Sequence, residues 1–327
     1  MNRSAWSRML AATVLAMGAL APPQSLAQVP GRFYWKSLSG ASAVPVIVNS
    51  ISGNTNPFDM GHTVTPGANF DATLAMMGYA QTFALWDRSA MAAIIFPMGR
   101  ISGDVTVAGK TASQSASGFG DPTLEFNLNL IGPKAQKTIP DALRYEPGFS
   151  LDLLADLALP IGEYNSDQAL NLGQNRWYGR IGAPIVWQLG SWTPGRRTTL
   201  EFLPAVWLFG NNTNYLGGQT LKTDPLFQLD AHITRDFTER IWGAIDGVWY
   251  SGGQASINGV MQGSKLNNIG LGLTLGYTIN DNINMTFGYK STVNDSAPTD
   301  LRMDGFQITL VFGWHPLIEG SKRLKSE

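Results

Sequence analysis

A strict two-residue alternation between residues 265 and 290 is the feature that most constrains this fold. From Leu271 to Ile279 apolar residues occupy every second position, with Gly or Thr between them, and the alternation resumes from Ile283 to Tyr289 after a short turn. A period of two predicts strands with one apolar face each, and the tight turn at 280–282 predicts a β-hairpin. Runs of this length suffice for tilted strands to cross a bilayer, although a soluble sandwich hairpin would share the pattern.

The N-terminus has the pattern of a secretory signal peptide. Two arginines precede an apolar run at residues 9–20, and Ser25-Leu26-Ala27 is a small-residue cleavage pattern. We therefore predict export with a cleavable signal peptide of residues 1–27. Neither this run nor any later one approaches the roughly 18 residues that a transmembrane helix needs. Any later membrane crossing is therefore expected to use strands.

Composition narrows the class of protein further. Charged residues make up only 14% of the chain, which is low for a soluble enzyme, while a mean hydropathy of -0.04 is too polar for a helical membrane protein. The formal net charge of -1 gives no indication of nucleic-acid binding. The chain has no cysteine, which excludes disulfides and cysteine-based metal sites or nucleophiles.

Alternating segments recur along most of the chain and predict about twelve strands, including the two of the hairpin and one before Asn49. The other predicted strands are 70–85, 90–101, 118–130, 149–161, 176–189, 198–209, 226–237, 241–250 and 303–314. Their connections alternate in length: 86–89, 191–197, 238–240 and 280–282 are short, whereas 102–117, 163–175, 211–223, 252–264 and 294–301 are long and polar.

Short connections at one end and long ones at the other are typical of outer-membrane barrels, whereas the fold of a soluble β-sandwich does not require them. We therefore predict an all-β fold: an antiparallel transmembrane β-barrel of the outer membrane, with short periplasmic turns and long external loops. Only the connection 132–147 is long where a short one is expected. The barrel is assigned to residues 70–315 and a polar tail to 316–327. Residues 28–69 are expected to form either a first strand and loop or a partial plug.

Aromatic residues fall near the predicted strand ends, as interfacial girdles require. The alternative is a scatter of core aromatics. Those near the short turns are Trp86, Trp187, Trp192, Trp242, Tyr277 and Trp314, and those near the long loops are Tyr164, Trp177, Trp249, Tyr250 and Tyr289.

Several stretches resemble a known family, the transporter-like outer-membrane proteins named for the meta-pathway of phenol degradation. The matching pieces run in order over roughly residues 56–312: NPFDMGHTV, LAMMGYAQTFALWDRSAMAAIIFPMGRISGDV, SGFGDPTLEFNLNLIG, ALNLGQNRWYGRIGAP, AVWLFGNNTNYLGGQTLKTDPLFQL and DGVWYSGGQASINGV. The resemblance implies an outer-membrane barrel that passes small aromatic or other apolar compounds, with a link to their catabolism. The last strand also looks like the signal read by the barrel-assembly machinery, although the tail after Trp314 departs from that pattern.

The parity of the strands predicts which charges line the lumen, because a charge facing lipid at mid-bilayer would cost about 2–4 kcal/mol. The predicted lumen-lining residues are Glu125, Asp152, Asp156, Arg180, Glu201, Asp230, His232 and Lys290. They favour either a packed interior in which charges pair or a water-filled passage with a slight acidic surplus. The apolar residues Leu203, Trp207, Val248 and Tyr250 share this face and suit an apolar or aromatic solute.

Two prolines inside predicted strands suggest a further feature. Pro184 and Pro204 lie on neighbouring strands, and proline cannot donate a hydrogen bond to the ladder. One interpretation is that they mark the outer ends of their strands. The other is a local weakness that creates a lateral opening to lipid.

Nothing in the sequence favours catalysis. The chain has three histidines, and we expect His232 to form a lumen hydrogen bond with Asp230 rather than to activate a nucleophile. No metal or cofactor site is predicted. The expected partners are outer-membrane lipid, a small apolar or aromatic solute and the assembly machinery, without nucleic acid. A channel is favoured over a plugged structural or adhesive barrel, and an outer-membrane hydrolase is the least supported alternative.

Overall fold

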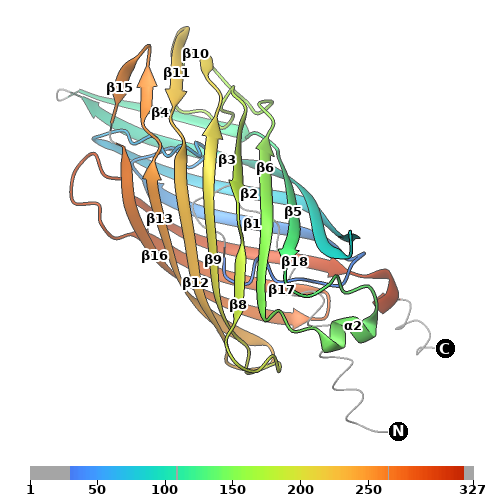
Figure 1. Ribbon diagram of the computed structural model, residues 1–327. Helices are drawn as coiled ribbons and strands as arrows, with labels where there is room; N and C mark the ends of the chain where they lie inside the picture. The colour runs from blue at the N-terminus through green and yellow to red at the C-terminus, as the bar shows by residue number, and fades with distance from the viewer. Residues whose placement is uncertain (1–29, 108–109, 264, 320–327) are drawn as a thin grey trace.

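The computed structural model describes residues 30–107, 110–263 and 265–319 as a closed antiparallel β-barrel (Figure 1). The predicted signal peptide and residues 320–327 of the predicted tail lie outside the described residues. Within them, no helix is both long and apolar enough to cross a bilayer. The paired strands make up the wall of the barrel, as the alternation predicts.

The strands succeed one another along the chain with mostly short connections. They are β1 (Ser42–Gly53), β2 (Ala68–Leu85), β3 (Arg88–Val107), β4 (Lys110–Phe119), β5 (Thr123–Ile131), β6 (Phe149–Ala158), β7 (Tyr178–Gly182), β8 (Ile185–Gln188), β9 (Thr198–Phe209), β10 (Asn212–Tyr215), β11 (Gln219–Thr223), β12 (Leu226–Asp236), β13 (Ile241–Gly252), β14 (Ala255–Ile257), β15 (Val260–Gln262), β16 (Leu266–Asn280), β17 (Ile283–Thr292) and β18 (Met303–Trp314).

Fourteen of these strands form one sheet that closes on itself. β1 pairs with β18, from Ser42 opposite Trp314 to Gly53 opposite Met303, and β9 pairs with β12. β4 and β5 both pair with β3, and β7 and β8 both lie between β6 and β9, so the 14 strands occupy twelve positions in the wall. The predicted strand number is therefore confirmed.

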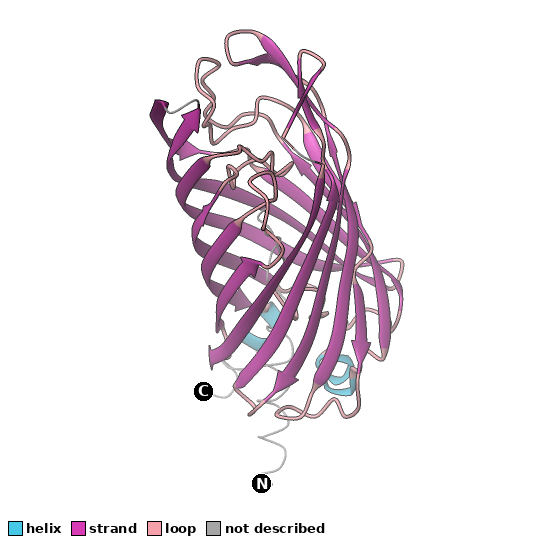
Figure 2. Cartoon of the chain, turned by 90° about the vertical axis from the view of Figure 1, so that its left-hand side faces the viewer, coloured by secondary structure: helices cyan, strands magenta, loops and turns pink. Residues whose placement is uncertain are grey.

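The two ends of the barrel differ, as the sorted connections predict. β10, β11, β14 and β15 form a small second sheet at the end with the long loops, which we call the long-loop end (Figures 1 and 2). The opposite, short-turn end carries α2 (Ile139–Arg144), inserted in the long 132–147 connection. Thr138 and Asp141 cap its first turn reciprocally.

The wall has an apolar outer face and an inner face of small and polar residues. Burial alternates residue by residue along β16, where Leu271, Leu273 and Leu275 point outward and are exposed. The glycines and threonines between them face the lumen. An exposed apolar belt of this kind fits contact with the hydrocarbon of a bilayer.

Residues 28–69 include one wall strand and two inward segments. β1 belongs to the wall, so the barrel begins before residue 70. Residues 30–41, which we call the plug segment, are mostly buried and lie before β1. Residues 54–67 form a loop whose Phe58 and Met60 are buried in the apolar cluster of the lumen.

The predicted aromatic girdles need a correction. Trp86, Trp187 and Trp177 are exposed on the outside as expected. Trp192 and Tyr250 are instead buried inside, and Trp242 points inward and packs on Arg32. Trp192 lies in a turn that folds against the plug segment, and Tyr250 has the inward parity of β13.

Introducing a charge on the outer face tests whether this face meets lipid. Leu273→Arg should destabilise the barrel by about 2–4 kcal/mol, because the guanidinium loses its hydration in the bilayer. Urea-induced unfolding in lipid vesicles measures this change, with Leu273→Val as the matched control. A loss below about 1 kcal/mol for the arginine variant would place this face outside the hydrocarbon.

Candidate functional site

The candidate site is the lumen, which contains three groups of side chains. The plug segment lies at the short-turn end. A set of polar residues that we call the charge belt, Glu125, Asp156, Arg180, Gln228 and Asp230, lies next to it. An apolar layer borders the belt and reaches the long-loop end.

Arg32 fixes the plug segment to the wall. Its guanidinium donates to Asp236 Oδ1 at 2.6 Å and to Thr234 Oγ1 at 3.2 Å, and its backbone N–H donates to Glu201 Oε2 at 2.7 Å. Trp35 Nε1 donates to the other oxygen of Glu201 at 2.8 Å. The inward carboxylates of β9 and β12 thus find their partners on the plug segment.

Further contacts hold the rest of the plug segment. The Arg32 guanidinium lies between the rings of Trp35 and Trp242, at 4.3 and 4.5 Å from their centroids. Trp35 also packs on Trp192, and Lys36 forms an ion pair with Asp152. These contacts are buried, so water and dissolved salt weaken the ion pairs much less than they would at the surface.

Glycines on the inner face of β16 make room for these side chains. A Cβ on Gly276 would lie 2.0 Å from Cε2 of Trp242, and one on Gly272 would lie 2.7 Å from Cγ of Lys290. Because glycine occupies the inward-facing position 276 of β16, the Trp242 ring has the space to pack against Arg32. Gly272 likewise leaves room for Lys290 against the inner face of β16, as the parity predicts.

The charge belt crosses five neighbouring strands, β5, β6, β7, β9 and β12, and Trp207 of β9 links its two parts. Arg180 Nε donates to Asp156 Oδ2 at 2.6 Å, and its guanidinium lies 5.0 Å from the centroid of Trp207. Trp207 Nε1 donates to Gln228 Oε1 at 2.7 Å, and Gln228 Nε2 donates to Asp230 Oδ2 at 2.8 Å. Glu125 lies directly opposite Asp156 on β5.

His232 has a different partner from the one expected. Its Nδ1 lies 2.6 Å from Asp246 Oδ1, and Thr274 Oγ1 donates to the other oxygen of Asp246 at 2.6 Å. The expected bond to Asp230 is wrong because Asp246 lies directly opposite His232 on β13, whereas Asp230 accepts from Gln228. Cross-strand neighbours are closer than residues two apart on one strand.

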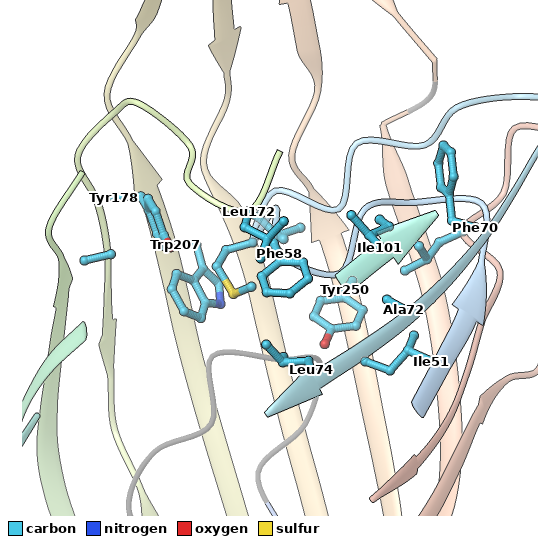
Figure 3. Packing of buried hydrophobic residues seen from close by; sticks show 14 of the residues in the cluster. Ile51, Phe58, Phe70, Ala72, Leu74, Ile101, Leu172, Tyr178, Trp207 and Tyr250 are labelled. Carbon is cyan, nitrogen blue, oxygen red and sulfur yellow. The ribbon is translucent and has the colours of Figure 1, made fainter. Parts of the chain in front are cut away.

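The apolar layer spans the lumen with residues from distant parts of the chain. Figure 3 shows Trp207 and Tyr178 on one side, Phe70 and Ile51 on the other and Phe58 between them. Trp207, Val248 and Tyr250, three of the predicted inward apolar residues, belong to this cluster. Leu203 is buried in a second cluster with plug residues Phe33 to Trp35.

Polar contacts of Arg176 hold the 54–67 loop over the apolar layer. Arg176 Nη2 donates to Asp59 Oδ1 at 3.0 Å, and Nη1 donates to Thr223 Oγ1 at 2.7 Å. The ring of His62 packs edge-on against Tyr250 at 4.9 Å. Burial lowers the pKa of His62 to about 4, an effect that Asp59 partly opposes.

The structure thus gives each predicted residue a position. Seven of the eight predicted lumen residues are buried with inward parity, and Lys290 is half-buried on the same face. Pro184 separates β7 from β8 and Pro204 lies within β9. Ala183 N–H still donates to Pro204 O at 2.9 Å, and the register with β9 is the same on both sides of the interruption. A lateral opening there stays a prediction.

Sequence reasoning missed several residues that complete the site. Asp236 and Asp246 have the inward parity of their strands and could have been included on that ground. Arg32, Trp35 and Lys36 precede the first strand, where apolar and polar residues do not alternate. The only sequence feature that could have indicated their role is the cluster of basic and aromatic residues there. Among the described residues, no group of three His, Asp or Glu has an arrangement that could hold a metal ion.

The comparisons with known proteins agree with this architecture. The model of the family described as "Putative MetA-pathway of phenol degradation" matches residues 53–310, which is well over half of the chain. No curated protein is significantly similar to the chain in sequence.

Solved structures similar to the chain include an outer membrane channel and parts of two autotransporters. The chain is similar to an outer membrane channel from Pseudomonas putida F1, with 19% identity and a TM-score of 0.69 over 90% of this chain and 100% of that one. It is more distantly similar to the transport unit of autotransporter AIDA-I from Escherichia coli, with 9% identity, a TM-score of 0.48 and coverage of 95% and 99%. The chain is also similar to the β domain of the Bordetella autotransporter BrkA, with 9% identity and a TM-score of 0.48, over 84% of this chain and 99% of that one.

A substitution at Gly276 tests how the hairpin supports the plug segment. Gly276→Ala should destabilise the barrel by about 1–3 kcal/mol, because the new methyl group displaces Trp242 from Arg32. Gly288→Ala is the matched control, since its Cβ would have no neighbour closer than 3.8 Å. Unfolding free energy and tryptophan fluorescence report the two changes. Equal effects of the two variants would contradict the proposed role of Gly276.

The pKa of His62 predicts a pH-sensitive loop. An unfolded histidine with a pKa of 6.5 takes up a proton that the closed loop, with its pKa of about 4, does not. Protonation of His62 should therefore destabilise the closed loop by up to about 3 kcal/mol as the pH falls from 6.5 to 4, and this contribution should not grow further below pH 4. Hydrogen exchange of residues 54–67, corrected for intrinsic rates, measures the loss. His62→Gln should remove the dependence, and an unchanged profile in this variant would refute it.

Proposed function

The chain belongs to the family described as "Putative MetA-pathway of phenol degradation", and we propose that it is an outer-membrane channel for small hydrophobic or aromatic compounds, linked to their catabolism. The observation that carries this proposal is the apolar layer across the lumen. Aliphatic and aromatic side chains from β2, β9 and β13 meet there with Phe58 and Leu172 (Figure 3). Such a layer offers a favourable environment to an apolar solute and an unfavourable one to a hydrated ion.

Passage through the lumen requires the plug segment to move or to leave a path beside it. Arg32, Trp35 and Lys36 anchor it through side chains that end on the wall. Breaking these anchors would free the short-turn end without touching the hydrogen-bond ladder of the wall. Outer-membrane lipid would surround the barrel, and the barrel-assembly machinery would insert it through its last strand.

The same plug segment favours a second candidate, a structural or adhesive barrel whose lumen stays closed. In that case the long loops and the small sheet of β10, β11, β14 and β15 would carry the function. We propose no catalytic role. His232 points its Nδ1 to Asp246, and this carboxylate also accepts from Thr274, so the pair is part of the wall lining.

Transport measurements separate the two candidates. Liposomes that contain the wild-type protein should take up toluene or phenol faster than protein-free liposomes. Their ion conductance should stay low, because the apolar layer and the plug segment obstruct hydrated ions. The double variant Arg32→Ala/Trp35→Ala should raise single-channel conductance in planar bilayers, since it removes the contacts with Asp236 and Glu201.

Lys134→Ala serves as the matched control, because it removes an exposed cation near the same end of the barrel. Its conductance should equal that of the wild type. Uptake equal to that of protein-free liposomes, together with no conductance steps in the double variant, would overturn the channel and leave the structural barrel.

A further inference from the structure

The charge belt contains buried polar atoms that the protein itself does not satisfy. The carboxyl groups of Glu125 and Asp156 lie within hydrogen-bonding reach of each other. Among the described residues, both carboxylate oxygens of Glu125 and Oδ1 of Asp156 have no hydrogen-bond partner on any other residue. Arg180 Nη2 and the hydroxyl of Tyr34 also have none. All four side chains are buried. Because buried carboxylate oxygens are normally paired or hydrogen-bonded, this cluster indicates a ligand.

Strand register brings two carboxylates to one point of the belt. Glu125 on β5 lies directly opposite Asp156 on β6, and both point into the lumen. Directly opposite residues have their Cβ atoms about 5 Å apart, so the carboxyl groups lie within reach of one small ion. Arg180, opposite Asp156 on the other side, binds only Oδ2 of Asp156. Arg180 therefore leaves Oδ1 of Asp156 without a hydrogen bond.

The local charge is matched to a monovalent cation. When both carboxyl groups are ionised, Glu125 and Asp156 carry two negative charges and Arg180 one positive charge, which leaves a surplus of one negative charge. The neighbouring belt residue Asp230 adds a further carboxylate, whose field is opposed by Lys290. Like charges on adjacent buried carboxylates are not tolerated without a proton or a cation between them.

The plug segment contributes a neutral oxygen to the same place. The Tyr34 hydroxyl interacts electrostatically with Arg180, Glu125 and Asp156. A phenolic oxygen can accept a contact from a cation as a carboxylate does. The wall and the plug segment therefore converge on one point.

We propose that the belt binds a small monovalent cation, such as potassium or ammonium, between the carboxylates of Glu125 and Asp156, with the Tyr34 hydroxyl as an additional ligand. The cation neutralises Glu125 and connects the plug segment to the wall. This site goes beyond passage of apolar solutes and does not depend on it, since binding requires no transport.

Heat unfolding of the purified barrel in detergent tests the site, because a ligand that binds only the folded state raises the unfolding midpoint. At constant ionic strength, chloride salts of potassium and of ammonium are each compared with the bulky cation N-methylglucamine. The wild type should unfold at a higher temperature in at least one of the small cations. Comparison of the two arms identifies which cation is preferred.

Glu125→Gln should weaken this cation binding roughly tenfold or more, because it removes a charged ligand. Tyr34→Phe should weaken it less and also serves if the first variant does not assemble. The matched control Asp71→Asn removes an exposed carboxylate of β2 and should keep the full effect.

A wild-type midpoint that is the same in all three salts would overturn the proposal, as would an unchanged cation effect in Glu125→Gln. An infrared carbonyl band of a protonated acid at neutral pH, lost in Glu125→Gln, would show that a proton occupies the place of the cation and would also overturn it. None of these outcomes bears on solute uptake, so a failure here is distinguishable from a failure of the channel function.

Discussion

Closure of the β-wall is the constraint on which the rest of this structure depends. A bilayer offers no partner to backbone N–H and C=O groups, so a sheet within it must leave no free edge. Pairing of β1 with β18 and of β9 with β12 meets that requirement. A closed wall has only two faces, and successive side chains alternate between them. Charged residues excluded by the lipid must therefore collect in the lumen, whatever their function.

The lumen accommodates these charges largely by pairing them, and the plug segment supplies part of the pairing. Glu201 and Asp152 project from the wall and find Arg32, Trp35 and Lys36 of that segment. Removing one partner of a buried pair leaves an uncompensated charge, which costs several kcal/mol. The plug segment is consequently part of the electrostatic balance of the barrel. Its displacement would require water or a solute to take over the same carboxylates.

The period of two predicted the strands, their number and the inward face of the eight residues assigned to the lumen, because these properties are local. Partners across strands could not be predicted in the same way. His232 was matched with Asp230 on its own strand, whereas the register of β12 and β13 places Asp246 opposite it. Register depends on the turn and on packing across the lumen. The plug segment has no alternation at all, so its place inside the barrel follows only from tertiary contacts such as that of Arg32 with Asp236.

The order of the groups in the lumen determines where a solute meets resistance. If the proposed function holds, an apolar compound that enters from the long-loop end would be stabilised in the apolar layer around Trp207 and Tyr250, which are buried there. The next group is the charge belt, where the compound would have to separate polar groups without offering hydrogen bonds in return. Tyr34 of the plug segment lies close to that belt. A ligand that binds the charge belt more tightly when the plug segment is in place stabilises the closed barrel, because binding shifts the equilibrium toward the state with the higher affinity. The slow step for an apolar solute should therefore lie between the apolar layer and the plug segment, at Arg180 and its neighbours, rather than at the long loops.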